Sequence, residues 1–544
     1  MRTSRSVVIG VDSSTQSTKA VAVDAGTGEL LAVGRAPHTV TGTGGARESD
    51  PEEWWTALVT AVRAAVRDAG VPAASVTGIA VAGQQHGLVT LGADGRPLRP
   101  ALLWNDTRSA PQAAALAAAL GGPTSWLERT GSVPVASMTA AKWQWLREHE
   151  PAHAAATTGV RLPHDYLTER LTGHAVTDPG DASGTCWYGN GIATAEETAV
   201  AKEATESADG RVGASDAAGA SDTPGTYDTA GAYDTPDTPD TPGAYDPAIL
   251  DLLGLDRTLL PAVAPTGATR VGTLTESAAE ALGLPRTVAV AAGTGDNMAA
   301  AVGLGLGGAG LLDHPVVSLG TSGTVFAATR ARPARPGLAG FAATDGTYLP
   351  LGCTLNCTLA VDRFATLLGL DREDAVPGAE GGVVVLPYLD GERTPDLPHA
   401  AGLVTGLRHT TDPRAILGAA YEGAAFTVLR ALDELLTACG LDVTDSAVRD
   451  RPLRLIGGGA RGRVWTDTVR RLSGRPLVVP AAEELVALGA AALAAGAVTG
   501  DDPVALATAW GTGTGDVLPP VKRSTETWDR IAGVLTAASP ELLR

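Results

Sequence analysis

Short apolar runs near the start of the chain alternate with polar turns in the manner of β-strands. Residues 7–11, 19–24 and 30–35 are rich in valine, leucine and alanine, and residues 25–28 between the last two read Ala-Gly-Thr-Gly. Apolar runs of this length bounded by turn residues predict strands. We therefore expect the chain to open with one strand followed by a β-hairpin.

Helical patterns separate further strands. Residues 51–67 follow Ser49-Asp50 and predict a capped helix, whereas residues 76–81 predict a buried strand. Residues 413–436 repeat apolar positions at helical spacing after a proline, which predicts an amphipathic core helix. Residues 485–498 form an apolar run of 14 residues. Because a membrane span needs roughly 18 residues, this run predicts a buried helix, and the whole pattern indicates an α/β protein.

The length and composition indicate a globular chain with more than one domain. The 544 residues exceed what one hydrophobic core usually supports, and 44% of them are apolar while 19% are charged. Aromatic residues make up only 4%, so alanine and glycine must fill much of the interior.

One segment, residues 191–247, breaks the globular pattern. It contains no Leu, Phe, Trp or Met, and its 12 acidic residues against Lys202 and Arg211 give it a net charge of −10. Such a segment cannot bury enough apolar surface to offset its ordering entropy. We predict a disordered acidic insert, with a partner-binding or regulatory segment as the alternative.

Charge and cysteine content narrow the classes of partner and compartment. The net charge of −19 argues against binding to nucleic acid, since affinity for phosphates comes from clustered Lys and Arg. The apolar run at the start of the chain is too short for the core of a signal peptide. Four cysteines in a chain of this length are too sparse for a disulfide framework. We expect free thiols and a cytoplasmic protein that binds neither nucleic acid nor membrane.

Three turns rich in glycine, serine and threonine follow predicted strands, at residues 12–19, 320–324 and 457–461. Backbone amides and hydroxyls at such strand ends can surround phosphates, although an ordinary tight turn would explain any one of them alone. None has the spacing of a P-loop or of a dinucleotide-binding turn. Asp12 strengthens the phosphate interpretation, because a carboxylate beside phosphate-binding amides can hold Mg²⁺ directly or through water.

The motifs in these turns resemble a known superfamily. Asp-x-x-Thr-x-x-x-Lys from Asp12, Gly-Thr-Ser-Gly-Thr from Gly320 and Gly-Gly-Gly-Ala-Arg from Gly457 resemble the two phosphate motifs and the adenosine motif of actin-like ATPases. Within it, the sequence resembles the FGGY family of carbohydrate kinases in six further segments, at residues 83–87, 103–108, 162–167, 181–185, 295–297 and 386–395. These matches run from near residue 7 to near residue 495 and are interrupted only by the acidic insert.

The resemblance implies an α/β fold of two ribonuclease H-like (actin-like ATPase) domains with a cleft between them. We expect an N-terminal sugar-binding domain over residues 1–306 and a C-terminal nucleotide-binding domain over residues 307–544. It implies ATP-dependent phosphorylation of D-xylulose, with another ketose, a polyol or a sugar acid as the alternative. A non-enzymatic ATPase switch is a third interpretation. A homodimer is possible.

The resemblance also assigns roles to residues. Asp296 is the expected catalytic base, although its position before the helical residues 297–302 also suits an N-cap. The expected sugar pocket consists of Gln85, His86, Trp104, Asp296 and Asn297. A structural histidine and a core tryptophan are the alternatives for His86 and Trp104. Gln85 stands where the family commonly has methionine, which leaves the identity of the sugar open.

The remaining assignments concern the nucleotide. Asp12 is the expected Mg²⁺ ligand. Glycines near the adenosine would allow its close approach, since a Cβ would obstruct the base or ribose. The ATP contacts are expected from Ser13, Ser14, Thr15, Gly320, Thr321, Ser322, Gly323, Thr324, Gly457, Gly458 and Gly459. The role of Lys19 is left open, and Glu483-Glu484 stands where the family often has a more neutral run.

Overall fold

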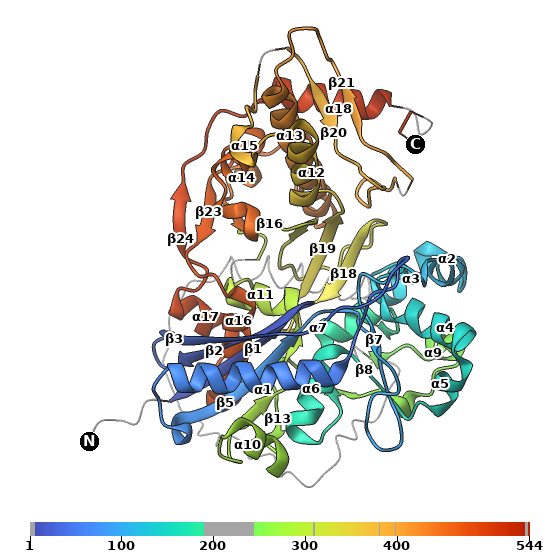
Figure 1. Ribbon diagram of the computed structural model, residues 1–544, viewed down its shortest axis with the longest axis vertical. Helices are drawn as coiled ribbons and strands as arrows, with labels where there is room; N and C mark the ends of the chain where they lie inside the picture. The colour runs from blue at the N-terminus through green and yellow to red at the C-terminus, as the bar shows by residue number, and fades with distance from the viewer. Residues whose placement is uncertain are drawn as a thin grey trace, which may run out of the picture.

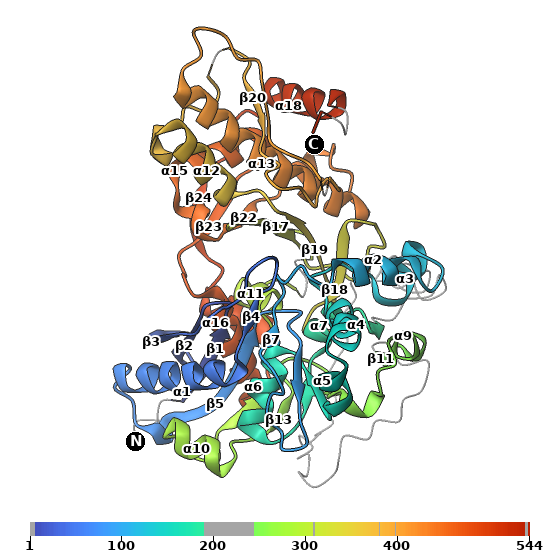
Figure 2. The same cartoon turned by 45° about the vertical axis from the view of Figure 1, so that its right-hand side comes forward.

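The computed structural model describes residues 6–189, 244–307, 311–379, 381–397, 399–538 and 542–543. Two halves are visible, each built around a mixed β-sheet (Figures 1 and 2). Most of the predicted insert, residues 191–243, lies outside the described residues. The prediction of disorder is wrong for residues 244–247, because β11 (Ala244–Tyr245) pairs with β10 (Tyr188–Gly189) and α9 (Pro247–Leu253) begins directly after it.

The first sheet contains the predicted opening strands. Its order is β13-β14-β5-β1-β2-β3, and β15 also pairs with β5. The strands are β1 (Val7–Ser13), β2 (Ser17–Asp24), β3 (Leu30–Pro37), β5 (Val76–Gly83), β13 (Arg270–Thr273), β14 (Ala289–Ala291) and β15 (Thr294–Gly295). Strand β2 is antiparallel to its neighbours β1 and β3, whereas β5 is parallel to β1 and β14 is parallel to β5. The predicted strand, hairpin and buried strand are thus confirmed.

The second sheet repeats this plan. Its order is β18-β19-β17-β16-β22-β23-β24. The strands are β16 (Val316–Leu319), β17 (Gly323–Phe326), β18 (Leu338–Ala342), β19 (Tyr348–Thr354), β22 (Leu453–Ile456), β23 (Leu477–Pro480) and β24 (Gly515–Leu518). Like β1, β16 forms a hairpin with the next strand and lies parallel to a later one, β22. Two copies of one sheet plan are the ribonuclease H-like, actin-like fold that was expected.

Helices cover both sheets. Those of the first half are α1 (Pro51–Asp68), α2 (Ala110–Ala118), α3 (Pro123–Thr130), α4 (Thr139–His149), α5 (Pro151–Ala156), α6 (Pro163–Thr172), α7 (Pro179–Ala182), α10 (Glu276–Leu282) and α11 (Asp296–Gly303). Those of the second half are α12 (Thr358–Leu368), α13 (Pro413–Ala438), α14 (Ser446–Arg449), α15 (Arg463–Ser473) and α18 (Thr525–Ala537). As predicted, Asp50 caps α1 by accepting the N–H of Glu52.

Short strand pairs and single turns of 3₁₀-helix fill the connections. The short strands are β4 (Glu48–Ser49), β6 (Val89–Leu91), β7 (Ala101–Leu102), β8 (Gly159–Arg161), β9 (Val176–Thr177), β12 (Ala262–Val263), β20 (Val384–Leu386) and β21 (Leu403–Thr405).

Helix α13 lies in the core of the second half. By length and composition it is the helix among the described residues that could cross a membrane, but 83% of its most apolar window is buried inside the protein. Its side chains pack with those of β16, β20, α12 and α15 in one hydrophobic cluster. The prediction of a core helix is confirmed, but its amphipathic character is not, because every residue from 417 to 429 is buried, on all faces of the helix.

Two helices late in the sequence belong spatially to the first sheet. Figure 1 shows α16 (Leu485–Thr499) and α17 (Pro503–Trp510) beside strands β1–β3. Their alanines and leucines share a cluster with Val8, Val21 and Val23. The division after residue 306 stays a prediction. Residues 485–510, expected in the C-terminal domain, pack against the sheet of the first half.

Glycines allow α16 to approach its neighbours closely. A Cβ on Gly10 of β1 would lie 1.9 Å from the carbonyl oxygen of Ala487. A Cβ on Gly489 would lie 1.8 Å from the carbonyl oxygen of Ala299, and one on Gly303 would lie 2.2 Å from that of Leu485. Helix α16 therefore fixes both β1 and α11 through backbone-to-backbone contact.

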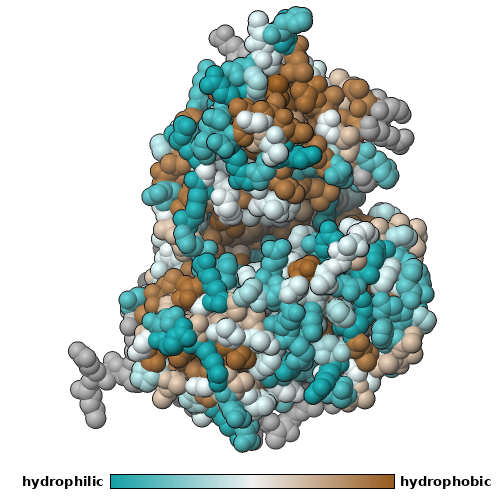
Figure 3. Space-filling view, viewed as in Figure 1, coloured by the Kyte–Doolittle hydropathy of each residue, from teal (hydrophilic) through white to brown (hydrophobic). Residues whose placement is uncertain are grey.

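The edge strand β18 joins the two halves on one side. The N–H of Gly340 donates to the carbonyl of Gly131 at 2.8 Å, and the N–H of Ala342 donates to Ser183 Oγ at 3.0 Å. A hydrophobic cluster runs continuously from α4 and α9 to Phe341 and other residues of β18 and β19. Elsewhere, the surface is hollowed between the two halves (Figure 3).

Candidate active site

The expected residues of the first half meet where parallel strands end. Strand β1 ends at Ser13 and β15 ends at Gly295, and both residues pair with Gly83 at the end of β5. The residues that follow each strand must therefore leave the sheet at the same edge. Gln85 and Asp296 therefore leave the sheet at the same edge as Asp12, which pairs with Ala82 of β5.

A chain of hydrogen bonds connects three expected sugar-pocket residues. Asn297 Nδ2 donates to Gln85 Oε1 at 2.8 Å and to Asp296 Oδ1 at 3.2 Å. The backbone N–H of Asn297 also donates to Asp296 Oδ1, at 2.8 Å. Gln85 is only 4% exposed, so its amide holds the Asn297 side chain in place from below.

Asp296 is the first residue of α11, and its N-cap is Gly295. The capping alternative for Asp296 is therefore wrong, because its side chain lies one position inside the helix. Burial, together with the negative charges of Asp12 and Asp181, raises the pKa of its carboxyl to about 7. A carboxylate with a pKa near neutrality can accept and release a proton at physiological pH.

His86 carries a neutral imidazole. Burial lowers its pKa to about 3, and the positive charges of Lys142 and Arg393 act in the same direction. Nδ1 lies 2.9 Å from the carbonyl oxygen of Gly184, so it must donate a proton there. That leaves Nε2 as an acceptor for a hydroxyl. Phe341 of β18 packs against the ring at 5.5 Å between centroids.

Trp104 is 38% exposed, which excludes the alternative of a core tryptophan. Its indole Nε1 donates to Thr15 Oγ1 at 3.0 Å. Trp104 of the expected sugar pocket and Thr15 of the expected phosphate turn are thus in direct contact.

Asp12 sits buried beside this edge. Ser14 Oγ donates to Asp12 Oδ1 at 2.6 Å, and Lys19 Nζ lies 3.9 Å from Oδ2. Burial raises the pKa of Asp12, whereas the Ser14 hydrogen bond and the Lys19 charge oppose that rise.

A loop residue that the sequence analysis gave no role completes the surroundings of Asp12. Glu484, just before α16, pairs with Lys19 at 2.9 Å and also with Arg35. Its neighbour Glu483 pairs with Arg461 of the second half at 3.0 Å. These two glutamates therefore connect the turn at residues 12–19 with the turn at residues 457–461.

The two turns of the second half are adjacent. Strands β16 and β22 are parallel neighbours, so the turns at residues 320–324 and 457–461 emerge side by side. A Cβ on Gly457 would lie 2.7 Å from the carbonyl oxygen of Leu319, and one on Gly459 would lie 2.8 Å from Leu319 Cβ. Contact with β16 therefore explains these two glycines, whereas nothing lies within 4 Å of a Cβ on Gly458.

A fully buried acidic cluster lies behind the site and was missed as a functional feature. His164 Nδ1 lies 2.6 Å from Asp181 Oδ2, and Nε2 lies 3.3 Å from Asp165 Oδ1. Burial raises the pKa of Asp181 well above its ordinary value, while the nearby Gln85 amide opposes the rise. A Cβ on Gly295 would lie 2.6 Å from Gln85 Cγ and 3.0 Å from Asp181 Oδ1, so the cluster supports Gln85 directly. The sequence pointed to segments 162–167 and 181–185 through their resemblance to the family, but it gave no role to His164 or Asp181.

The four cysteines are free, as expected. Within the described ranges, no group of three or more His, Cys, Asp or Glu side chains could hold a metal ion by itself.

A repeated sheet plan with small-residue turns at the strand ends and buried carboxylates between them defines a two-domain enzyme of the actin-like ATPase fold. The sequence matches the FGGY family of carbohydrate kinases, with the N-terminal domain over residues 7–191 and 241–303 and the C-terminal domain over residues 316–498. The chain belongs to this family of sugar kinases. Membership of this family implies that ATP is a substrate and that a divalent metal ion is the usual cofactor.

Individual relatives match this chain over nearly its full length. The chain is 52% identical to a xylulose kinase of Streptomyces rubiginosus over 540 residues, covering 99% of this chain and 98% of the relative. A xylulose kinase of Streptomyces coelicolor is also 52% identical, over 543 residues, with 99% and 98% covered. Among solved structures, a "xyloylose kinase" from Brucella ovis superposes with a TM-score of 0.79 at 29% identity, covering 98% of this chain and 99% of that one.

Proposed function

We propose that this chain transfers the γ-phosphate of ATP to D-xylulose and forms D-xylulose 5-phosphate. The names of the full-length relatives at 52% identity support the choice of sugar. The hydrogen-bonded chain from Gln85 through Asn297 to Asp296 is the observation in this molecule that carries the proposal. It places a potential base among amides that match the hydroxyls of a ketose.

Asp296 would act as the general base. Its carboxylate accepts the proton of the sugar's primary hydroxyl while that oxygen forms a bond to the γ-phosphorus. The bond from the γ-phosphorus to the bridging oxygen breaks, and ADP leaves. A pKa of about 7 suits this transfer, since the group can be ionised when the sugar arrives and can hold the proton afterwards.

The sugar would contact hydrogen-bonding side chains and one aromatic ring. Asn297 would offer its side-chain oxygen as an acceptor, because both hydrogens of Nδ2 are donated to Gln85 and Asp296, and His86 would offer Nε2 as a second acceptor. Trp104 offers a partly exposed ring as a wall, oriented by Thr15. Sites that pair substrate hydroxyls in this way reject analogues that lack them.

Magnesium is the divalent metal we propose, with Asp12 as its protein ligand. Mg²⁺ is usually bound by one or two carboxylates together with substrate phosphates. The negative charge of Asp12 helps to raise the pKa of Asp296, a repulsion that a bound cation would relieve. When bound, the metal supplies positive charge to the transferring phosphoryl group. The nucleotide phosphates and adenosine are assigned to the turns at residues 13–15, 320–324 and 457–459.

The deciding experiment measures ADP release in the presence of D-xylulose, ribulose, glycerol, gluconate and xylitol. We expect the highest kcat/KM with D-xylulose. The absence of ketose-dependent ADP release would refute the proposal. Asp296→Ala should abolish transfer while calorimetry still detects ATP binding, and full activity in this variant would remove Asp296 from the role of base.

The second candidate is a kinase of the same family with another sugar. Gln85 favours it, because its amide fixes Asn297 in the pocket where a methionine would not. The same panel distinguishes the two. A cytoplasmic location and a homodimer also stay predictions, and light scattering of the purified protein tests the second.

A further inference from the structure

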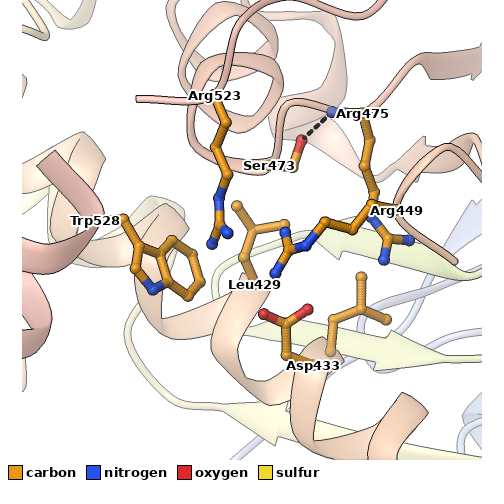
Figure 4. A pocket seen from close by; sticks show the side chains of 8 residues that line it. Leu429, Asp433, Arg449, Ser473, Arg475, Arg523 and Trp528 are labelled. Atoms are coloured by element: carbon orange, nitrogen blue, oxygen red, sulfur yellow. Dashed lines mark hydrogen bonds between the residues drawn. The ribbon is translucent and has the colours of Figure 1, made fainter. Parts of the chain in front are cut away.

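Three arginines from separate elements line one pocket in the second half. Arg449 ends α14, Arg475 lies between α15 and β23, and Arg523 precedes α18. Figure 4 shows their side chains extending toward the carboxylate of Asp433 on α13, with Trp528 at one side.

Arg475 is the residue that needs an explanation. It is 2% exposed, and neither Nη1 nor Nη2 has a hydrogen-bond partner within the part of the chain that the structure describes. Burying a charged group without partners costs several kcal/mol or more in free energy. Burial lowers its pKa to about 10, which still leaves the guanidinium charged at neutral pH.

Asp433 offsets only part of the positive charge in this pocket. Asp433 is the one carboxylate that lines the pocket, and no ion pair within 4.0 Å joins it to these arginines in the described ranges. Arg523 is occupied differently, because its guanidinium lies 4.4 Å from the Trp528 ring centroid and Nε donates to the carbonyl of Leu472 at 3.0 Å. Three positive charges face one negative charge, so the pocket has a positive excess.

The space between these side chains is small, although the pocket is partly open to solvent. The cavity holds about 10 Å³ of room for the centre of an occupant, and leucines and Trp528 form its apolar walls. Roughly this much room is what one water molecule requires. A water molecule would supply an acceptor without compensating the charge, whereas a monatomic anion such as chloride, which is larger than water, does both.

We propose that this pocket binds a small inorganic anion, and that the occupant is chloride, a compact anion that would accept the unpartnered N–H groups of Arg475 and compensate its charge. The anion would accept N–H groups from Arg475 and its neighbours and would stabilise the junction of α13, α14, α15 and α18. The site is separate from the proposed sugar and nucleotide residues, and its existence does not depend on the substrate.

The first test is diffraction. Crystals of the full chain soaked in sodium bromide should show an anomalous peak within hydrogen-bonding distance of the Arg475 guanidinium. A peak-free pocket at high bromide occupancy elsewhere would overturn the proposal.

The second test measures thermal unfolding of the full chain while chloride replaces glutamate at constant ionic strength. We expect a saturable rise of about 2–5 °C in the wild-type protein. Arg475→Gln should lose this dependence. Lys522→Gln removes one exposed cation beside Arg523 and should keep it.

The outcomes separate the possible occupants. If the pocket is empty, Arg475→Gln relieves an unpaired buried charge and raises the unfolding temperature in every anion, which would refute anion binding. A response to phosphate but not to chloride would refute the halide. If Arg475→Gln does not fold, the half-buried Arg449→Gln provides the same comparison.

Discussion

Replacing Asp296 by asparagine should stabilise the ligand-free protein above neutral pH while it abolishes phosphoryl transfer. The carboxyl has an ordinary pKa of 3.8, and the site raises it to about 7. A raised carboxyl pKa means that the folded protein holds the proton more tightly than the unfolded chain. Folding stability from this group is therefore greatest at low pH and falls as the pH rises from about 4 to about 7.

The magnitude follows from the size of the shift. Each pKa unit corresponds to about 1.4 kcal/mol, so ionised Asp296 lowers the free energy of unfolding by up to about 4 kcal/mol above pH 7. Asparagine has no proton to lose. The stability of Asp296→Asn minus that of the wild type should grow by about 2–3 kcal/mol between pH 5 and pH 8.

Urea unfolding of both proteins at several pH values measures this difference. Asp529→Asn, an exposed aspartate on α18, serves as the control and should show no such growth. A difference that is constant with pH, or an Asp296→Asn variant that is less stable than the wild type at pH 8, would contradict the burial and charge repulsion inferred around Asp296.

Three further changes test other contacts. Trp104→Phe and Thr15→Ala each break the 3.0 Å hydrogen bond between them, so their effects on kcat/KM should be less than additive by about 0.5–1.5 kcal/mol in a double-mutant cycle; additive effects would mean that the contact is not formed in solution. Gly489→Ala places a Cβ 1.8 Å from the Ala299 carbonyl and should lower the free energy of unfolding by about 1–3 kcal/mol or more, whereas Gly533→Ala on α18, where the space is open, should be neutral or stabilising; equal unfolding midpoints for the two would argue against the close α11–α16 contact. Lys19→Met removes the 2.9 Å pair with buried Glu484 and should cost about 1–3 kcal/mol in urea unfolding, and a neutral result would show that Arg35 alone satisfies Glu484.

Much of the fold could be predicted because its signals are local. The runs at residues 7–11 and 453–456 became β1 and β22, and the apolar run at residues 485–498 became α16. Each depends on the periodicity of neighbouring residues. The small-residue turns were also visible, since they directly follow the strands that present them.

Contacts between distant segments were harder to predict. His164 and Asp181 are 17 residues apart and form a buried pair, while Glu484 meets Lys19 only because α16 returns to the first sheet. The pocket arginines at positions 449, 475 and 523 come from three connections of the second half. No pattern along the chain brings such residues together, because strand order and helix packing determine their distances.

The composition of α16 has a consequence for the entropy of folding. Alanine and glycine have no side-chain rotamers to lose when they are buried, so the contacts of α16 with β1 and α11 form without that entropic cost. A layer of leucine or methionine would lose side-chain freedom at every position. The start of α11, where Asp296 lies, therefore rests on a support with few alternative packings, and positions such as Gly10, Gly303 and Gly489 should tolerate substitution as poorly as residues that touch the substrate.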